Sequence, residues 1–150
     1  MKNTTELATT LSLNRAAGAE VNNKLNKPFS SGKKNILNMY CTAGYPALES
    51  TATVLLALQQ HGADIIELGI PYSDPIADGP VIQQSNMQAL QNGISIQKIF
   101  FQLNAIKDQL QIPVILMGYL NPVIQYGIEK FCADAAAAGV SGIILPDLPM

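Results

Sequence analysis

The sequence contains no tryptophan, one histidine and two cysteines, and each shortage narrows the chemistry available to the chain. His61 falls at the end of an expected helix, away from the sheet edge where a catalytic base would have to lie. With His61 discounted, Ser-His and Cys-His nucleophilic catalysis have no base. Cys41 and Cys132 form no CxxC pattern. We therefore expect two buried free thiols in a reducing, cytoplasmic compartment.

Long apolar runs and nucleotide-binding motifs are also missing. No stretch of about 18 apolar residues occurs, so the sequence predicts no membrane span. The first ten residues, MKNTTELATT, lack the apolar centre of a secretory signal. Neither GxGxxG nor GxxxxGK[ST] is present, which argues against a dinucleotide fingerprint and a P-loop.

Positive charge is scarce outside the first part of the chain. Residues 1–34 hold six of the nine Lys and Arg against two acids, a net charge of +4. Residues 35–150 hold three Lys against nine acids, a net charge of −6. Nucleic-acid binding requires a basic face, so the acidic body argues against it.

Short apolar strands alternate with amphipathic helices from residue 33 onward, which predicts an α/β fold with a parallel sheet covered by helices. Strands are expected at 35–42, 64–68, 113–117 and 141–145, and helices at 47–60, 81–91, 96–110 and 122–138. Residues 1–32 are expected to be an N-terminal extension, flexible or weakly helical. Within this part, NRAAGAEVNNKL favours a weak helix and KPFSSGKK, at 27–34, a linker. Residues 33–150 are expected to form one domain.

Polar side chains follow the ends of these strands, where parallel α/β folds place their sites. They are Tyr40, Thr42, Glu67, Asp74, Asp78, Tyr119, Asn121 and Asp147. The two tyrosines among them either line a pocket or pack in the core.

The segment ELGIPYSDPIADGP, at 67–80, gathers three of these acids. Glu67 should emerge from an apolar strand at the top edge of the sheet, which suits a general acid or base, although pairing with a lysine or capping a helix is commoner for a glutamate. Asp74 and Asp78 stand in Asp-Pro and Asp-Gly turn dipeptides. They could stabilise their own turns or hold Mg²⁺ with a substrate phosphate.

The segment ELGIPYSDPIADGPVIQ closely resembles the signature of the tryptophan synthase alpha chain family. The resemblance begins at NMYCTAGYP, continues through LMGYLNPVIQYGIEKFCADAAAAGVSGIILPDLP and covers about residues 33–150. It implies a (β/α)8 TIM barrel and a lyase of the carbon–oxygen class that acts in tryptophan biosynthesis. Such an enzyme cleaves indole-3-glycerol phosphate to indole and glyceraldehyde 3-phosphate by a retro-aldol route. A beta chain then joins the indole to L-serine with pyridoxal phosphate.

The resemblance also implies roles for particular residues. Glu67 and Asp78 match the catalytic pair, and Tyr40, Thr42 and Tyr119 match positions around the substrate. Pro71 and Asp74 fall in the loop that faces the beta chain, in a tetramer of two alpha and two beta chains. No cofactor or metal is expected in the chain itself.

The number of strands sets one further expectation. A (β/α)8 barrel typically needs about 250 residues, and its phosphate site usually comes from the loops after the seventh and eighth strands. With four strands, this chain is expected to be the N-terminal half of a longer enzyme. The alternative is a catalytically incomplete chain that only binds the beta chain.

Overall fold

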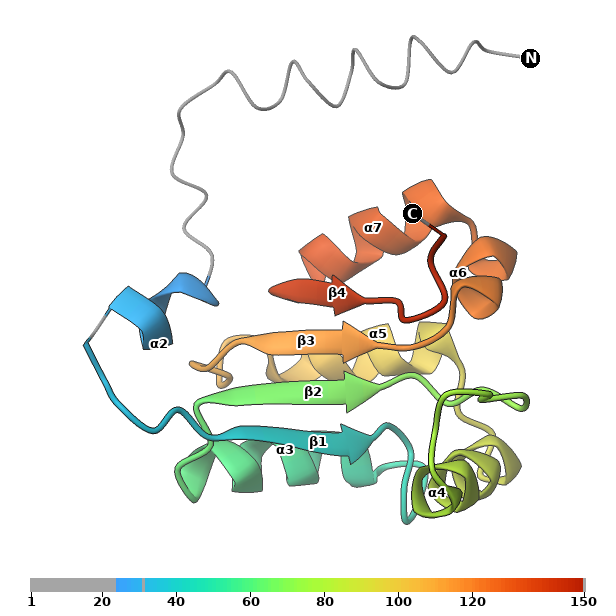
Figure 1. Ribbon diagram of the computed structural model, residues 1–150, viewed down its shortest axis with the longest axis horizontal. Helices are drawn as coiled ribbons and strands as arrows, with labels where there is room; N and C mark the ends of the chain where they lie inside the picture. Colours follow the sequence, from blue (N-terminus) through green and yellow to red (C-terminus); the bar gives the residue numbers. More distant parts are fainter. Residues whose placement is uncertain (1–23, 31, 150) are drawn as a thin grey trace, which may run out of the picture.

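Four parallel strands form the sheet of the computed structural model, which describes residues 24–30 and 32–149 (Figure 1). They are β1 (Asn38–Thr42), β2 (Ile65–Gly69), β3 (Val114–Met117) and β4 (Gly142–Ile144), and they lie side by side in chain order. Every neighbouring pair is parallel, because each connection carries helices that return the chain to the same end. All four predicted strands are confirmed, each with a later start than the sequence indicated.

The helices occupy two positions around this sheet. Helices α3 (Ser50–Gln60), α5 (Ile96–Ile106) and α7 (Ile128–Ala137) share one core with the sheet, and Figure 1 shows α3 and α5 behind the strands and α7 beside β4. Helices α4 (Pro80–Gln91) and α6 (Leu120–Tyr126) lie at the end where the strands terminate. This order and layering is that of three consecutive βα units and a fourth strand of a (β/α)8 barrel, which confirms the expected fold class.

The core lies between the sheet and the three helices on its covered face. Ile66, Leu68 and Leu116 from the strands are fully buried there. They belong to one apolar cluster with helix residues that include Leu55, Ile99, Phe100, Leu103 and Phe131. The ring centroid of Phe131 lies 5.4 Å from that of Phe100 and 6.2 Å from that of Tyr126.

The opposite face of the sheet carries a different set of side chains. The register places Tyr40 of β1 opposite Glu67 of β2, and Glu67 opposite Ile115 of β3. Since side chains alternate between the faces of a strand, these three lie on the face away from Ile66 and Leu68. In a closed barrel this face points to the interior.

Particular residue types mark the ends of several helices. Ser95 caps α5, and its hydroxyl accepts a hydrogen bond from the Lys98 amide at 3.3 Å, which is the role serine often has before the first turn of a helix. Gly62, Gly93 and Gly139 follow helix ends with positive φ angles, in the conformation that glycine adopts most readily.

The single helix predicted over 122–138 is wrong. Gly127, with φ 95° and ψ 116°, separates α6 from α7. The apolar spacing continues on both sides of this glycine, so periodicity alone did not reveal the break. Helix α5 is also shorter than predicted, since it ends at Ile106 rather than near residue 110.

Two further predictions need correction. The linker expected over 27–34 begins as a short helix, α2 (Asn26–Ser30), and the Lys24 Nζ beside it donates to the Leu110 carbonyl at 2.6 Å. The weak helix expected at 14–25 lies almost wholly outside the described residues, and the division at residue 32 stays a prediction. None of the helices within 24–30 and 32–149 is long and apolar enough to cross a membrane.

The cysteines differ from each other. Cys41 is half-buried against the core, and burial raises the pKa of its thiol to about 11. Cys132 is exposed on α7, so the expectation that both thiols are buried is wrong for this one.

Truncation of the buried aromatic cluster tests this core. Phe131 is 1% exposed, and Phe131→Ala should lower the free energy of unfolding by about 3–5 kcal/mol in chemical denaturation, because it removes a ring and leaves a cavity. The control is Phe101→Ala on α5, where the ring is 76% exposed and the change should stay within about 0.5 kcal/mol. Equal losses in the two variants would contradict this packing.

Candidate active site

Glu67 lies deeper in the sheet than the sequence suggested. Strand β2 ends at Gly69, one residue after the predicted end, so Glu67 is the middle residue of five rather than the fourth. Glu67 therefore lies two residues before the end of the strand, one residue further from the sheet edge than expected. Its Oε1 accepts a hydrogen bond from Asn38 Nδ2 at 2.6 Å, so its partner is an amide and neither a lysine nor a helix end. The carboxyl group is half-buried on the face away from the helices.

Tyr40 is the neighbour of Glu67 across the strands, and its phenol reaches over Gly69. A Cβ atom added to Gly69 would lie 2.1 Å from the Tyr40 hydroxyl oxygen, so only glycine leaves room for the ring. The Tyr40 hydroxyl interacts with the Thr42 side chain, and burial raises the pKa of the phenol. Thr42 is itself buried and shares a hydrogen bond of 2.8 Å with the Ser85 hydroxyl on α4.

Asp78 reaches Tyr40 from the loop between β2 and α4. A cavity of about 10 Å³ is lined by Tyr40, Asp78, Asn86 and Tyr119, together with Ile70, Met117, Gly118 and Pro146. The Tyr119 hydroxyl accepts a hydrogen bond from the Ala77 amide at 2.9 Å and also interacts with the Asp78 carboxylate. Asn86 Nδ2 donates to Asp78 Oδ2 at 3.4 Å. Burial of Tyr119 raises the pKa of its phenol, and the negative charge of Asp78 adds to this.

The two predicted carboxylates therefore lie on different sides of Tyr40, that of Glu67 toward Asn38 and that of Asp78 at the cavity. Glu67 lies beside Tyr40 in the neighbouring strand, whereas Asp78 lies at the cavity that the Tyr40 phenol helps to line. Glu67 is not part of that cavity wall. A flat aromatic ligand placed against Tyr40 would thus have the Glu67 carboxylate on its strand side and the Asp78 carboxylate on its loop side. Such an arrangement can exchange a proton and accept a hydrogen bond at different atoms of one ligand.

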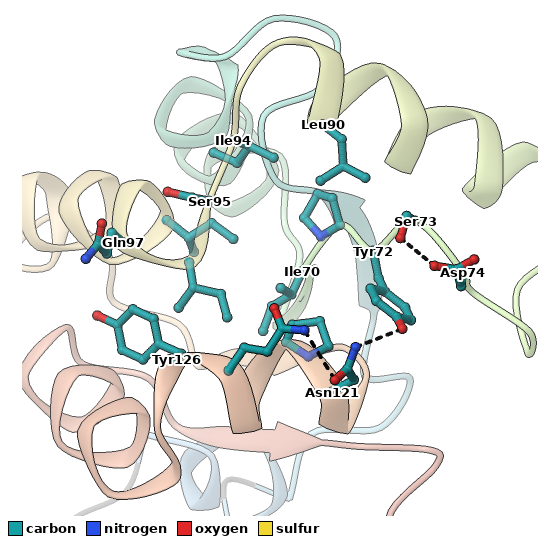
Figure 2. Close-up of a pocket in the computed structure, with 15 residues that line it drawn as sticks. Ile70, Tyr72, Ser73, Asp74, Leu90, Ile94, Ser95, Gln97, Asn121 and Tyr126 are labelled. Atoms are coloured by element: carbon teal, nitrogen blue, oxygen red, sulfur yellow. Dashed lines mark hydrogen bonds between the residues drawn. The ribbon is translucent and has the colours of Figure 1, made fainter.

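Pro71 and Asp74 line a separate hollow outside the sheet (Figure 2). This hollow has a volume of about 510 Å³. In Figure 2, Leu90 and Ile94 line the hollow at the top and Ile70 near the centre, while Ser73, Asp74 and Asn121 contribute polar groups at the right. The Ser73 hydroxyl donates to Asp74 Oδ2 at 2.5 Å, and Asn121 Nδ2 donates to the Tyr72 hydroxyl at 3.1 Å.

The hypothesis of a metal held by Asp74 and Asp78 finds no support in this geometry. The two carboxylates line different cavities. In the part of the chain that the structure describes, no three His, Cys, Asp or Glu side chains gather closely enough to hold a metal ion.

Sequence reasoning missed Asn86 and Ser85, which bring α4 into contact with the site. Asn86 shares the buried face of α4 with Ala89, three residues further on. A polar residue at a core position of an amphipathic helix was the signal available.

The chain is similar to known proteins of one family. The family model for the tryptophan synthase alpha chain matches residues 27–150. The chain is 56% identical over 127 residues to the tryptophan synthase alpha chain of Parabacteroides distasonis and 50% identical to that of Bacteroides fragilis. These matches cover 85% of this chain and 49% and 48% of the relatives, so the chain spans about half the length of the curated relatives it matches.

Solved structures agree with these relatives. Tryptophan synthase subunit alpha from Legionella pneumophila superposes with a TM-score of 0.80 at 42% identity, over 85% of this chain and 50% of that one. An open form of tryptophan synthase from M. tuberculosis, with BRD0059 bound, superposes with a TM-score of 0.78 at 37% identity, over 84% of this chain and 51% of that one.

Gly69→Ala tests the contact between Gly69 and Tyr40. The added methyl group collides with the phenol, so we expect a loss of about 1–3 kcal/mol in the free energy of unfolding. In a double-mutant cycle, Tyr40→Ala should relieve most of this loss because it removes the colliding ring. Gly79→Ala is the control, since a Cβ there meets nothing within 4 Å. Purely additive losses at positions 40 and 69 would show that the ring lies elsewhere.

Proposed function

Because this chain belongs to the tryptophan synthase alpha chain family, we propose that it serves tryptophan biosynthesis as a lyase that cleaves indole-3-glycerol phosphate to indole and glyceraldehyde 3-phosphate. The observation that carries the proposal is the position of Glu67 and Asp78, on either side of Tyr40, within the segment that the family model matches. An aromatic side chain between two carboxylates suits a substrate whose reacting part is an indole ring.

The reaction breaks the carbon–carbon bond between indole C3 and the glycerol side chain. Protonation of C3 turns the ring into an electron sink and leaves a positive charge shared with the ring nitrogen. A base removes the proton from the adjacent side-chain hydroxyl, whose oxygen then forms the aldehyde carbonyl as the bond electrons return to the ring. The enzyme must therefore supply one group that moves protons and one that offsets the charge.

Glu67 suits the proton transfers. It is held between apolar neighbours on a rigid strand, and its Oε1 bond to the Asn38 amide at 2.6 Å fixes one oxygen while the carboxyl group stays half-buried. A carboxyl group held in this way can donate a proton to one atom of a ligand and accept one from another.

Asp78 suits the second task. The Asp78 carboxylate already accepts hydrogen bonds from Asn86 and Tyr119, so it can accept another from a ligand. The indole N–H becomes a stronger donor as positive charge develops on the ring. The loop from Pro71 to Gly79 that carries Asp78 would close over the bound substrate and limit access of water.

A beta chain is the proposed partner, in a tetramer of two alpha and two beta chains. The hollow lined by Pro71 and Asp74 lies on the same loop as Asp78, so a partner bound there would contact the loop that carries a reacting group. Ile76 in this loop is 88% exposed, which favours burial against a partner or substrate. Pyridoxal phosphate would belong to the beta chain, and this chain would work in the cytoplasm without a cofactor.

A second candidate function is binding of the beta chain without turnover. The chain spans about half the length of its relatives, and the loops that usually bind phosphate in such barrels follow later strands than β4. The surface around Pro71 and Asp74 would still be available for the beta chain.

Glu67→Gln should abolish indole release in the protein expressed from its complete gene. Glutamine keeps the shape and the bond to Asn38 but cannot transfer the proton, so kcat should fall by at least about 10³-fold with little change in stability. Indole release is followed by absorbance, and EDTA should leave the wild-type rate unchanged. Retained turnover would exclude Glu67 from catalysis.

Beta-chain binding separates the two candidate functions. Titration calorimetry of this chain with the beta chain should show binding that Asp74→Lys weakens about tenfold or more, because it reverses the charge at the hollow. Asp78→Asn should leave this affinity intact while it lowers turnover. Tight binding without cleavage would favour the second candidate, and equal loss of binding and turnover in Asp78→Asn would indicate a folding defect.

A further inference from the structure

Asn86 is buried at the candidate active site with one polar atom left unsatisfied. It lies on α4 and is 2% exposed, yet its Oδ1 has no hydrogen-bond partner within the described part of the chain. Its side chain lines the small cavity together with Tyr40, Asp78 and Tyr119. Buried polar atoms without partners are rare in folded proteins, and they gather at functional sites.

The orientation of this amide follows from its neighbour. Nδ2 donates to Asp78 Oδ2 at 3.4 Å, whereas the flipped amide would place its carbonyl oxygen against the carboxylate. The observed orientation is thus the one that serves Asp78 and leaves Oδ1 unpaired. The bond is long, as hydrogen bonds of catalytic groups often are before a substrate binds.

Stability does not explain this residue. A buried carbonyl without a partner disfavours folding, and an apolar side chain of the same shape would avoid that penalty. Gln102 on α5 offers a contrast, because its Oε1 is also buried and unpaired, but its Nε2 donates to the Leu48 backbone carbonyl at 2.9 Å. Gln102 therefore joins two parts of the backbone, whereas Asn86 donates to a side chain of the site.

We propose that Asn86 is a positioning residue, which holds the Asp78 carboxylate in the orientation that receives the indole N–H of the substrate. This inference rests on the proposed function of Asp78. The interaction with the Tyr119 hydroxyl constrains Asp78 from the β3 side, and Asn86 constrains it from α4. Two contacts from different elements fix a carboxylate on a loop that would otherwise rotate freely.

Asn86→Leu is the first test, in the protein expressed from its complete gene. The substitution keeps the branching of the side chain at Cγ and removes the donor, so kcat for cleavage of indole-3-glycerol phosphate should fall about ten- to a hundredfold while KM changes less than about twofold. The unfolding midpoint should stay equal or rise, because the unpaired Oδ1 is gone. Gln102→Met is the matched control and should leave kcat unchanged.

Asn86→Asp adds a pH readout that a packing role would not move. The introduced carboxyl group has the same shape but accepts hydrogen bonds, so kcat relative to wild type should be low at neutral pH. As the pH falls, the carboxyl group binds a proton and can donate again, and relative kcat should recover. The other titratable groups around it are Asp78, Tyr40 and Tyr119, with Asp147 near Tyr119, and the tyrosines do not titrate in this range.

The outcomes separate the two levels of the argument. Active wild type with unchanged kcat in Asn86→Leu, or a flat relative pH profile in Asn86→Asp, would overturn the positioning role and leave the proposed function standing. Wild type that cleaves no indole-3-glycerol phosphate would refute the proposed function and the inference together. A lower unfolding midpoint with proportional loss of kcat in both Asn86→Leu and Gln102→Met would assign Asn86 to packing and also overturn the inference.

Discussion

The alternation of side chains along β2 is the constraint on which the rest of the structure depends. Ile66 and Leu68 enter the core under the helices, so Glu67 between them must point to the other face. Burial of these two side chains contributes about 1.5–3 kcal/mol each, which fixes the register of the strand. A slip by one residue would bury the carboxylate and expose both apolar groups. The same burial that stabilises the sheet therefore positions Glu67 beside Tyr40.

The loop after β2 contributes residues to two different cavities. Pro71 and Asp74 line the outer hollow, and Asp78, only a few residues later, lines the cavity at Tyr40. The turn is pinned between them by the hydrogen bond from the Ala77 amide to the Tyr119 hydroxyl, 42 residues away in sequence. A shift of the outer part of the loop would thus reach Asp78 through this anchor, which would link the proposed partner surface to the proposed reacting group.

Local chemistry explains what the sequence could predict. The four strands, the cap at Ser95 and the glycines after helices each follow from nearest neighbours along the chain. The full depth of Glu67 did not, because Gly69 is as compatible with a loop as with a strand. The break at Gly127 did not either, since apolar spacing hides a change in backbone direction. Asn86 was not predicted as a site residue, because its proposed role depends on Asp78, which only the folded loop brings within hydrogen-bond distance.

The positions of the acids and lysines limit where the phosphate of the proposed substrate can lie. Glu67, Asp78 and Asp147 all belong to the side of the molecule where the reaction is proposed, and residues 35–150 carry a net charge of −6. Lys98 and Lys130 lie on α5 and α7 at the helix-covered face, and Lys33 pairs with Asp64 just before β2. These three lysines therefore lie on other elements than Glu67, Asp78 and Asp147. A phosphate dianion would be repelled by the carboxylates unless backbone amides or a positive group drew it away from them. The proposed reaction thus requires the glycerol phosphate to lie away from Glu67 and Asp78, where backbone amides or a positive group can bind it.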